Sequence, residues 1–236
     1  NVSYETNSRE LFSDVSFAIN AGDKIGLVGP NGAGKTTLLK IINGDIQPTS
    51  GDIISSGEEI GILPQNLNKW LDKTVYDFIE EVTGVKSARE EFDYQCERLP
   101  QEASEKTLLA YGEALERYEK FEVANFDTTI KKALSRAALR DIDPDRRLNT
   151  FSGGQRTRIS LAAVFASRYD LILLDEPTNN LDDSGVILLE DFIDNSPASF
   201  LIVSHDRHFL RNTAERIIEL TGGKSVNKYN LGYDEY

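Results

Sequence analysis

Several residues that cross-link proteins or carry chemistry are scarce in this sequence. It contains no methionine, one tryptophan, one cysteine and two histidines among 236 residues. The single Cys96 excludes a disulfide within the chain and is typical of a reducing compartment, so we expect a cytoplasmic protein. The start at Asn1 without any methionine has two explanations, an excised piece of a longer protein or methionines missing from the sequence.

Long apolar runs and positive charge are also lacking. No run approaches the ~18 apolar residues of a membrane-spanning helix, and no secretory signal is visible. The sequence contains 26 Lys and Arg and 39 Asp and Glu, which gives a net charge of −13. This balance argues against nonspecific wrapping of nucleic acid by the whole surface, but it leaves a local contact open.

The sequence does contain a glycine-rich phosphate-binding pattern. G-x-x-x-x-G-K-[ST] runs from Gly29 to Thr36, between an apolar strand at residues 25–28 and a helix at 36–42. Backbone N–H groups of such a loop and the helix N-terminus bind phosphate, Lys35 reaches the β- and γ-phosphates, and the Thr36 hydroxyl ligates Mg²⁺. The residues expected to contact the nucleotide here are Gly29, Asn31, Gly32, Ala33, Gly34, Lys35, Thr36 and Thr37.

Two acidic side chains, Asp175 and Glu176, follow a continuous apolar run that is typical of a strand buried on both faces. Open α/β sheets bind ligands at the carboxyl ends of their strands, so both carboxylates are expected to face the phosphates. We expect Asp175 to hold Mg²⁺, directly or from the second coordination sphere, and Glu176 to polarise the attacking water. His205 follows the next expected strand, at residues 200–203, and is predicted to contact the γ-phosphate.

Two further residues give weaker signals. Gln65 follows an expected strand at residues 59–63 and a proline, so its amide oxygen could meet Mg²⁺ or the attacking water. Tyr4 could stack on an adenine, but an exposed tyrosine at a strand end explains the residue equally well. Neither assignment follows from the residues alone.

The stretch from residue 67 to 149 is highly charged, with apolar residues at helical spacing. It predicts helices over residues 86–98 and 102–121 and a third helix capped by Asp127. The apolar residues of the second helix are expected to share one narrow stripe: Leu108, Leu109, Leu115, Tyr118 and Phe121. A mixed-charge helical pair is either a solvated hairpin or a projection that contacts a partner, and the residues leave both open.

Outside this stretch, strands and helices alternate. The sequence predicts a strand over residues 15–19, and a Thr74–Asp77 pair predicts the capping of a helix start. Ser152 is expected to precede a helix through Ala166. Further helices are expected over residues 183–193 and 206–213.

One segment resembles the signature of ABC ATPases: Phe151-Ser152-Gly153-Gly154-Gln155. Together with the phosphate loop, the acidic pair and His205, it implies an α/β fold, a P-loop NTPase ABC cassette with a RecA-like core, an N-terminal antiparallel β-subdomain and an α-helical signature subdomain. The implied divisions of this single cassette, 1–236, are a core at 1–65 and 150–221, a helical arm subdomain at 66–149 and the start of an interdomain linker at 222–236. ATP and Mg²⁺ are the implied cofactors, and hydrolysis of ATP to ADP and phosphate is the implied activity.

The same resemblance implies that the signature acts on a nucleotide held by another cassette. Ser152, Gly153, Gly154 and Gln155 would face the γ-phosphate of a second cassette, in the same chain or a homodimer. Two sites would then form only in a head-to-tail sandwich. A hydroxyl and glycine N–H groups at a helix start are suitable donors for phosphate.

Two other segments resemble the ABC-F branch, whose members carry tandem cassettes and no transmembrane domain. Ser204–Leu210 resembles the S-H-D-R-x-F-L of that branch, and residues 229–236 resemble the aromatic close of an ABC-F first cassette. The helical segment 102–140, which includes Ala110-Tyr111-Gly112-Glu113-Ala114-Leu115, also resembles the arm region of ABC-F proteins. Asn180 departs from the pattern, because ABC-F proteins usually carry His there in T-N-H-L-D.

The ABC-F resemblance implies ATP-dependent action on ribosomes, in translation or in antibiotic resistance by target protection. With a net charge of −13, contact with that polyanion would have to come from the arm and the linker. The alternative is the motor subunit of an ABC membrane transporter, which has a membrane partner. A third reading, a non-catalytic nucleotide-gated clamp, is disfavoured because Glu176 and His205 are both present.

Overall fold

The computed structural model describes residues 1–6, 9–64, 67–102, 104–221, 226–229 and 232–233. The chain forms two units, residues 1–65 with 169–236, and residues 66–168. Helix α6 (Gly153–Ala166) belongs to the second unit, because it packs on that unit's helices α2 and α5. The division expected from the sequence, after residue 149, differs from this one by the stretch 150–168.

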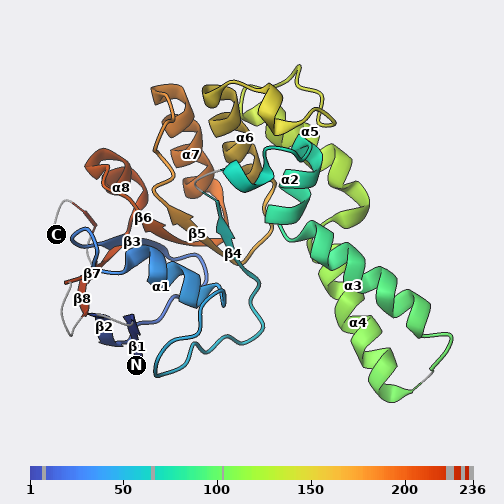
Figure 1. Cartoon of the computed structure of the whole chain (residues 1–236), viewed down its shortest axis with the longest axis horizontal. Coiled ribbons are helices and arrows are strands. Elements are labelled where there is room, and N and C mark those ends of the chain that lie inside the picture. The colour runs from blue at the N-terminus through green and yellow to red at the C-terminus, as the bar shows by residue number, and fades with distance from the viewer. Residues whose placement is uncertain (7–8, 65–66, 103, 222–225, 230–231, 234–236) are drawn as a thin grey trace. The chain divides into compact units, whose positions relative to one another are not determined.

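A six-stranded sheet forms the centre of the first unit, in the order β4-β5-β6-β3-β7-β8 (Figure 1). The first five of these strands run parallel, and β8 pairs antiparallel with β7. The strands of the sheet are β3 (Lys24–Val28), β4 (Ile60–Leu63), β5 (Leu171–Asp175), β6 (Ser199–Val203), β7 (Arg216–Leu220) and β8 (Val226–Tyr229). Because β5, β6 and β3 are neighbours, the segments that follow them open on one edge of the sheet.

Helices cover both faces of this sheet. In Figure 1, α1 (Lys35–Ile42) lies on one side, and α7 (Asp183–Asn195) and α8 (Arg207–Thr213) lie on the other. Leu171 and Leu173 of β5 belong to the same buried cluster as the apolar residues of α1. Their neighbours along the strand point to the opposite face and are also buried, which explains why this strand is apolar throughout.

The N-terminal strands form a separate antiparallel pair, β1 (Val2–Thr6) and β2 (Arg9–Val15). The strand that the sequence predicts over residues 15–19 is therefore wrong beyond Val15. In the register of this pair Val15 lies opposite Val2, and β2 ends at that residue. Val2, Phe12 and Val15 are buried in the same cluster as α1, so this pair packs beside the phosphate loop.

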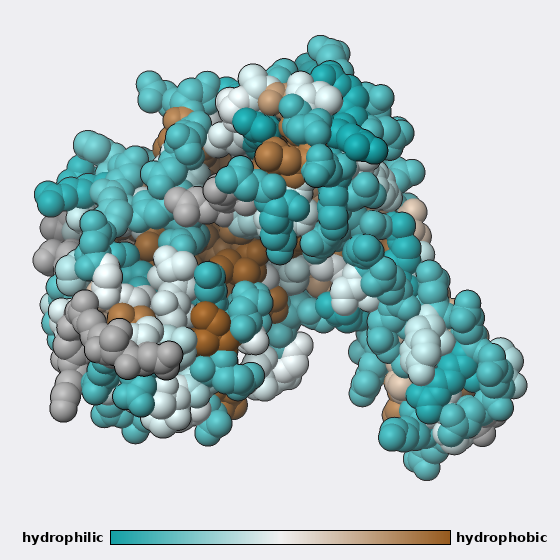
Figure 2. Space-filling model, in the orientation of Figure 1, coloured by the Kyte–Doolittle hydropathy of each residue, from teal (hydrophilic) through white to brown (hydrophobic). Residues whose placement is uncertain are grey.

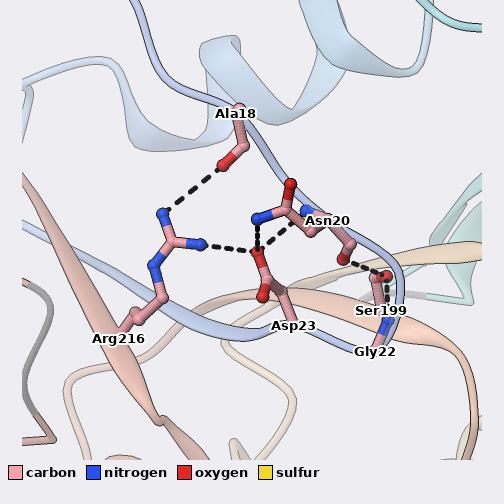
Figure 3. Close-up of polar contacts among 6 residues, drawn as sticks. All are labelled: Ala18, Asn20, Gly22, Asp23, Ser199 and Arg216. Atoms are coloured by element: carbon pink, nitrogen blue, oxygen red, sulfur yellow. Dashed lines mark hydrogen bonds and ion pairs between the residues drawn. The ribbon is translucent and has the colours of Figure 1, made fainter.

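A polar cluster fixes the turn that leads into β3 (Figure 3). The Asp23 carboxylate accepts hydrogen bonds from the Asn20 backbone N–H at 2.8 Å and from Arg216 Nη1 at 2.6 Å. Ser199 Oγ accepts from the Gly22 N–H at 3.0 Å and donates to the Asn20 carbonyl at 2.9 Å. These bonds join the starts of β3, β6 and β7, while their opposite ends carry the candidate site.

The described part of the second unit is built from the α-helices α2 (Val75–Val82), α3 (Val85–Arg98), α4 (Glu105–Lys120), α5 (Phe126–Arg136) and α6. α3 and α4 pack side by side as a hairpin (Figure 1), and α5 packs on α6. The predicted cap of α2 is confirmed, because Thr74 Oγ1 accepts from the Asp77 N–H at 3.0 Å and the Asp77 carboxylate accepts from the Thr74 N–H at 3.4 Å.

Two expectations for these helices are wrong. Leu108 and Leu109 are 56% and 64% exposed, because α4 buries the side that carries Thr107 and Ala114. The third helix begins at Phe126 with Asn125 in the cap position, so Asp127 lies inside its first turn. The Asp127 carboxylate is used elsewhere, in a hydrogen bond with the Tyr76 hydroxyl.

The C-terminal stretch contributes to the sheet. Residues 226–229, which the sequence assigns to the start of a linker, form β8 and pair with β7 over four residues. The rest of the expected linker lies largely outside the described residues. None of the helices in the described part of the chain is long and apolar enough to cross a membrane.

Candidate functional site

The phosphate loop lies between β3 and α1, as its sequence predicts. Lys35 bends back over the loop, where its Nζ donates to the Gly29 carbonyl at 2.8 Å and to the Pro30 carbonyl at 3.2 Å. Burial lowers the pKa of Lys35 below its ordinary value, while the carboxylates of Glu176 and Asp175 act in the opposite direction. The ammonium thus faces the end of β5, among hydrogen bonds that a phosphate could replace.

Two contacts that the sequence did not predict hold the loop from outside. Gly34 has φ +97°, and a Cβ there would lie 2.8 Å from Phe12 Cδ1 of β2. Gly29 has φ +145°, and a Cβ there would lie 2.2 Å from the Leu220 carbonyl oxygen of β7. Phe12 is 1% exposed, so close packing restricts the movement of its ring, which lies against the loop. The sequence of β2, Arg-Glu-Leu-Phe-Ser-Asp-Val, gives no signal for this role.

The two residues predicted to share a metal ion lie side by side. Thr36 Oγ1 donates a hydrogen bond to Asp175 Oδ2 at 2.7 Å. Hydroxyl and carboxylate oxygens are the ligands that Mg²⁺ prefers, and this ion usually takes one or two protein ligands and completes its shell with phosphate and water. Among the described residues, no three His, Cys, Asp or Glu side chains gather to bind a metal by themselves. The donor set therefore fits Mg²⁺ that arrives with a nucleotide.

Glu176 and His205 also meet at this edge. Glu176 Oε1 lies 3.4 Å from His205 Nε2, and Glu176 Oε2 accepts from the His205 backbone N–H at 3.2 Å. The Glu176 backbone adopts φ +49°, a left-handed conformation that is uncommon for glutamate, and its N–H donates to the Val203 carbonyl at 2.8 Å. Strained backbone of this kind is concentrated at functional sites. Here it turns the carboxylate from β5 toward the end of β6.

Of the two weaker candidates, only Tyr4 is described. It lies in β1, half-buried, with its ring centroid 6.3 Å from that of Phe12. This contact accounts for the tyrosine without a ligand and also leaves part of the ring accessible. Gln65 lies outside the described residues.

The signature residues cap a helix in the second unit. Ser152 Oγ accepts from the Gln155 N–H at 3.3 Å, and Gln155 Oε1 accepts from the Ser152 N–H at 3.0 Å. A Cβ at Gly153 or Gly154 would meet no atom of the described chain within 4 Å. Both glycines are exposed in the first turn of α6, so the packing of this chain does not require glycine at either position. They leave room for the close approach of another molecule.

Asn180 has a conformational explanation. Its φ is +63°, in the left-handed region where asparagine and histidine are both enriched. Asparagine therefore replaces the histidine that is usual in the ABC-F pattern without a change of backbone preference.

Residues 12–179 match the family described as ABC transporter. The chain belongs to this family. ATP hydrolysis is the general activity of its cassettes, which bind ATP. The expectation of an ABC ATPase is therefore confirmed.

Curated relatives include proteins of the ABC-F branch. The chain is 36% identical over 236 residues to the tylosin resistance ATP-binding protein TlrC of Streptomyces fradiae, a match that covers 98% of this chain and 43% of that protein. It is 36% identical over 228 residues to the energy-dependent translational throttle protein EttA of Mycobacterium tuberculosis, covering 96% and 40%. It is 33% identical over 237 residues to ABC transporter F family member 5 of Arabidopsis thaliana, covering 96% and 34%. The chain thus spans about two fifths of the length of the relatives it matches, and the expected resemblance to ABC-F proteins is confirmed.

Solved structures show the same fold. An inward-facing metal-chelate type ABC transporter matches with a TM-score of 0.66 and 23% identity, over 100% of this chain and 82% of that one. A nucleotide-free ATP-binding cassette from an ABC transporter matches with a TM-score of 0.65 and 19% identity, over 97% and 89%. The predicted fold class, an α/β ABC cassette, is confirmed.

Proposed function

We propose that this chain is an ATP-binding and ATP-hydrolysing cassette, the N-terminal cassette of an ABC-F protein that acts on ribosomes. The observation that carries the enzymatic part is the edge of the sheet where Lys35, the Thr36–Asp175 pair and the Glu176–His205 pair follow three neighbouring strands. The observation that carries the ribosomal part is the similarity to relatives named for translation and for antibiotic resistance.

In this mechanism each side chain has one task. Lys35 binds the β- and γ-phosphates through the ammonium that now bonds to loop carbonyls. Thr36 and Asp175 hold Mg²⁺, which when bound supplies positive charge against the phosphate oxygens. Glu176 orients the attacking water and accepts its proton, and His205 contacts the γ-phosphate. Gln65 is assigned to the metal or the water, and Tyr4 to the adenine.

The signature completes the site of a second cassette in this proposal. Ser152, Gly153, Gly154 and Gln155 lie exposed at a helix start, and neither glycine is required by local packing. A γ-phosphate that approaches this helix start would meet N–H donors without a Cβ in the way. The second cassette belongs to the same chain or to a homodimer, and ATP joins the two head to tail.

The cellular setting follows from the same relatives. One of these relatives is named for resistance to tylosin and the other for an energy-dependent throttle of translation. We therefore place the protein in the cytoplasm, bound to ribosomes in its ATP state.

The runner-up is a transporter motor that binds a membrane partner. It is favoured by the family description and by the fold match to a metal-chelate type transporter. The greater identity to ABC-F relatives, 36% against 23%, favours the ribosomal assignment.

The test uses the full-length protein with Glu176→Gln and the equivalent change in any second cassette, sedimented with ribosomes in ATP and in ADP. We expect co-sedimentation in ATP only, because a cassette that binds but does not hydrolyse ATP stays closed. Lys35→Ala is the control, since it should prevent the ATP effect. Absence of the protein from the ribosome pellet in both ATP and ADP would favour the transporter motor.

A further inference from the structure

Two polar side chains of the edge strand β8 reach the same carboxylate of β7. Asn227 Nδ2 donates to Glu219 Oε2 at 3.1 Å, and the Tyr229 hydroxyl donates to the same oxygen at 3.1 Å. In the antiparallel register Asn227 lies directly opposite Glu219, and Tyr229 lies two residues along, on the same face of the sheet. Opposite and diagonal neighbours on one face are the pairs through which strands stabilise each other. Glu219 therefore binds β8 through two donors on that face.

β8 has few other attachments to the described chain. It is four residues long and lies at the edge of the sheet, where it pairs with β7, and main-chain pairing holds such a short strand weakly. Val226 is the residue of β8 that packs against the buried cluster around α1. Figure 2 shows mainly teal and white side chains over the edge of the sheet where Figure 1 labels β7 and β8. The position of β8 thus depends strongly on the two bonds to Glu219.

The residue that follows Glu219 lies against the phosphate loop. Gly29 has φ +145°, and a Cβ there would lie 2.2 Å from the Leu220 carbonyl oxygen and 3.4 Å from Leu220 Cβ. Leu220 is fully buried in the same cluster as Leu27 of β3, and it pairs with Val226 of β8. Close packing of this kind transmits a displacement from one element to the next. The Gly29 peptide is therefore held in place by the end of the β7–β8 pair.

The Gly29 peptide is in direct contact with the ammonium of the loop. Lys35 Nζ donates to the Gly29 carbonyl at 2.8 Å. A shift of this peptide would move both the carbonyl that orients the ammonium and the start of the loop whose N–H groups bind phosphate. Contacts between neighbouring residues thus connect the carboxylate of Glu219 to the group assigned to the β- and γ-phosphates.

The charge of Glu219 by itself predicts the opposite effect. Glu219 pairs in register with Val28, the residue before Gly29, so its carboxylate lies on the strand next to the loop. A negative charge near the loop repels phosphate, and its removal would strengthen ATP binding if charge alone acted. Loss of the position of β7 would weaken ATP binding. The sign of the change in affinity therefore separates the two explanations.

We propose that Glu219 is a positioning residue for ATP binding, which fixes the β7–β8 pair and, through Leu220, the Gly29 end of the phosphate loop. Asn227 and Tyr229 are the donors that complete this arrangement. Both lie in the stretch that the sequence assigns to the start of a linker, an assignment that gives them no part in the cassette's own site. The inference rests on the proposed function for the placement of phosphate at this loop.

The test compares Glu219→Ala, Glu219→Gln and Arg216→Ala in the full-length protein, with the equivalent of Lys35→Ala in any second cassette so that ATP binds at one site. Arg216→Ala is the matched control, because Arg216 Nη1 bonds to Asp23 at 2.6 Å at the opposite end of β7. Calorimetric titration measures ATP affinity, and urea unfolding measures stability. Amide hydrogen exchange of residues 29–35 without nucleotide reports local opening of the loop.

We expect Glu219→Ala to weaken ATP binding by about 5- to 20-fold, less than the ~10²-fold that a 1 Å misplacement can cost, and to speed exchange of the loop amides. Glu219→Gln should stay within about twofold of the parent, because its amide oxygen accepts from both donors. Arg216→Ala should lower stability and leave ATP affinity within about twofold, because its site is distant from the loop.

Turnover provides a second readout. With both cassettes otherwise intact, Glu219→Ala should raise the KM for ATP and leave kcat within about twofold, because the groups that act on the attacking water are unchanged. A purely structural contact would lower the amount of folded enzyme and leave the KM as it is.

The outcomes separate this inference from the proposed function. Unchanged ATP affinity in Glu219→Ala, with a loss of stability like that of Arg216→Ala, would overturn the inference alone if Lys35→Ala still abolishes binding. Tighter binding by both Glu219 variants would assign the residue an electrostatic effect, and equal losses in both would show that the hydrogen-bond acceptor is not the cause; either result overturns the inference. If Lys35→Ala in this cassette binds ATP normally, the proposed phosphate site fails and the inference fails with it.

Discussion

Glu176 Oε1 lies 3.4 Å from His205 Nε2, and its other oxygen accepts the His205 backbone N–H at 3.2 Å. The histidine therefore holds the carboxylate from two sides. This geometry requires Glu176 to adopt a left-handed backbone conformation at the end of β5. A carboxylate whose position requires an uncommon backbone conformation is a good candidate for the group that orients water.

Glu176→Gln should keep ATP affinity within a few-fold and reduce turnover by about 10²–10⁴-fold, because an amide fits the same space but accepts no proton. Single-turnover hydrolysis and equilibrium binding of a fluorescent ATP analogue measure the two quantities. His205→Gln is the companion variant, and it should reduce turnover as well. Normal hydrolysis by the Glu176→Gln protein would show that another group is the base.

Lys35→Ala should abolish measurable ATP binding, because the ammonium is the main positive charge in the loop. Lys40→Ala on the same helix is the control, since its side chain is exposed and should leave affinity unchanged. Calorimetric titration with ATP distinguishes them. Equal ATP affinity in the two variants would contradict the placement of phosphate at this loop.

Phe12→Leu should weaken ATP binding more than its effect on stability explains. The Phe12 ring faces Gly34 of the phosphate loop, and a smaller side chain leaves space into which the loop can shift. Phe209→Leu is the matched control, because Phe209 is equally buried, 0% exposed against 1%, but lies on α8. Both should lower the free energy of unfolding by roughly 1–2 kcal/mol. If both also lower ATP affinity equally, Phe12 has no special role in placing the loop.

The Glu122–Arg168 ion pair predicts a dependence of stability on acid. Arg168 Nη2 lies 3.0 Å from Glu122 Oε2, and this hydrogen bond lowers the pKa of the carboxyl below its ordinary value. Because the folded-state pKa is depressed, the stabilisation is present above the unfolded pKa of about 4.5 and is lost as pH falls through the folded value. Both side chains are partly exposed, so the effect at pH 7 should be at most about 1 kcal/mol.

Glu122→Gln should therefore be less stable than the parent at pH 7 and equally stable near pH 3, where the parent carboxyl is neutral as well. Urea unfolding at both pH values measures the difference. Arg207→Leu, an exposed arginine on α8, is the control, and a Glu122–Arg168 contribution that persists at pH 3 would refute the assignment.

Local patterns predicted most of the elements. The strand before the phosphate loop, the capped starts of α2 and α6 and the apolar β5 all depend on neighbouring residues, and all are present. The errors arose where distant partners decide. The end of β2 depends on its register with β1, and the exposed face of α4 depends on where α3 packs.

The sequence by itself determined the chemistry of this protein, because phosphate loops, acidic pairs and helix-capping signatures are recognised by residue type and short spacing. Only the tertiary structure decided which side chains meet. The bond between Thr36 and Asp175 joins residues far apart in the chain, and the ring of Phe12 reaches Gly34 from another sheet. Exposure was likewise decided by the tertiary structure, since burial of one face of α5 leaves Lys131, Lys132 and Arg136 exposed on the other. Such contacts follow from strand order and helix packing, which no local pattern encodes.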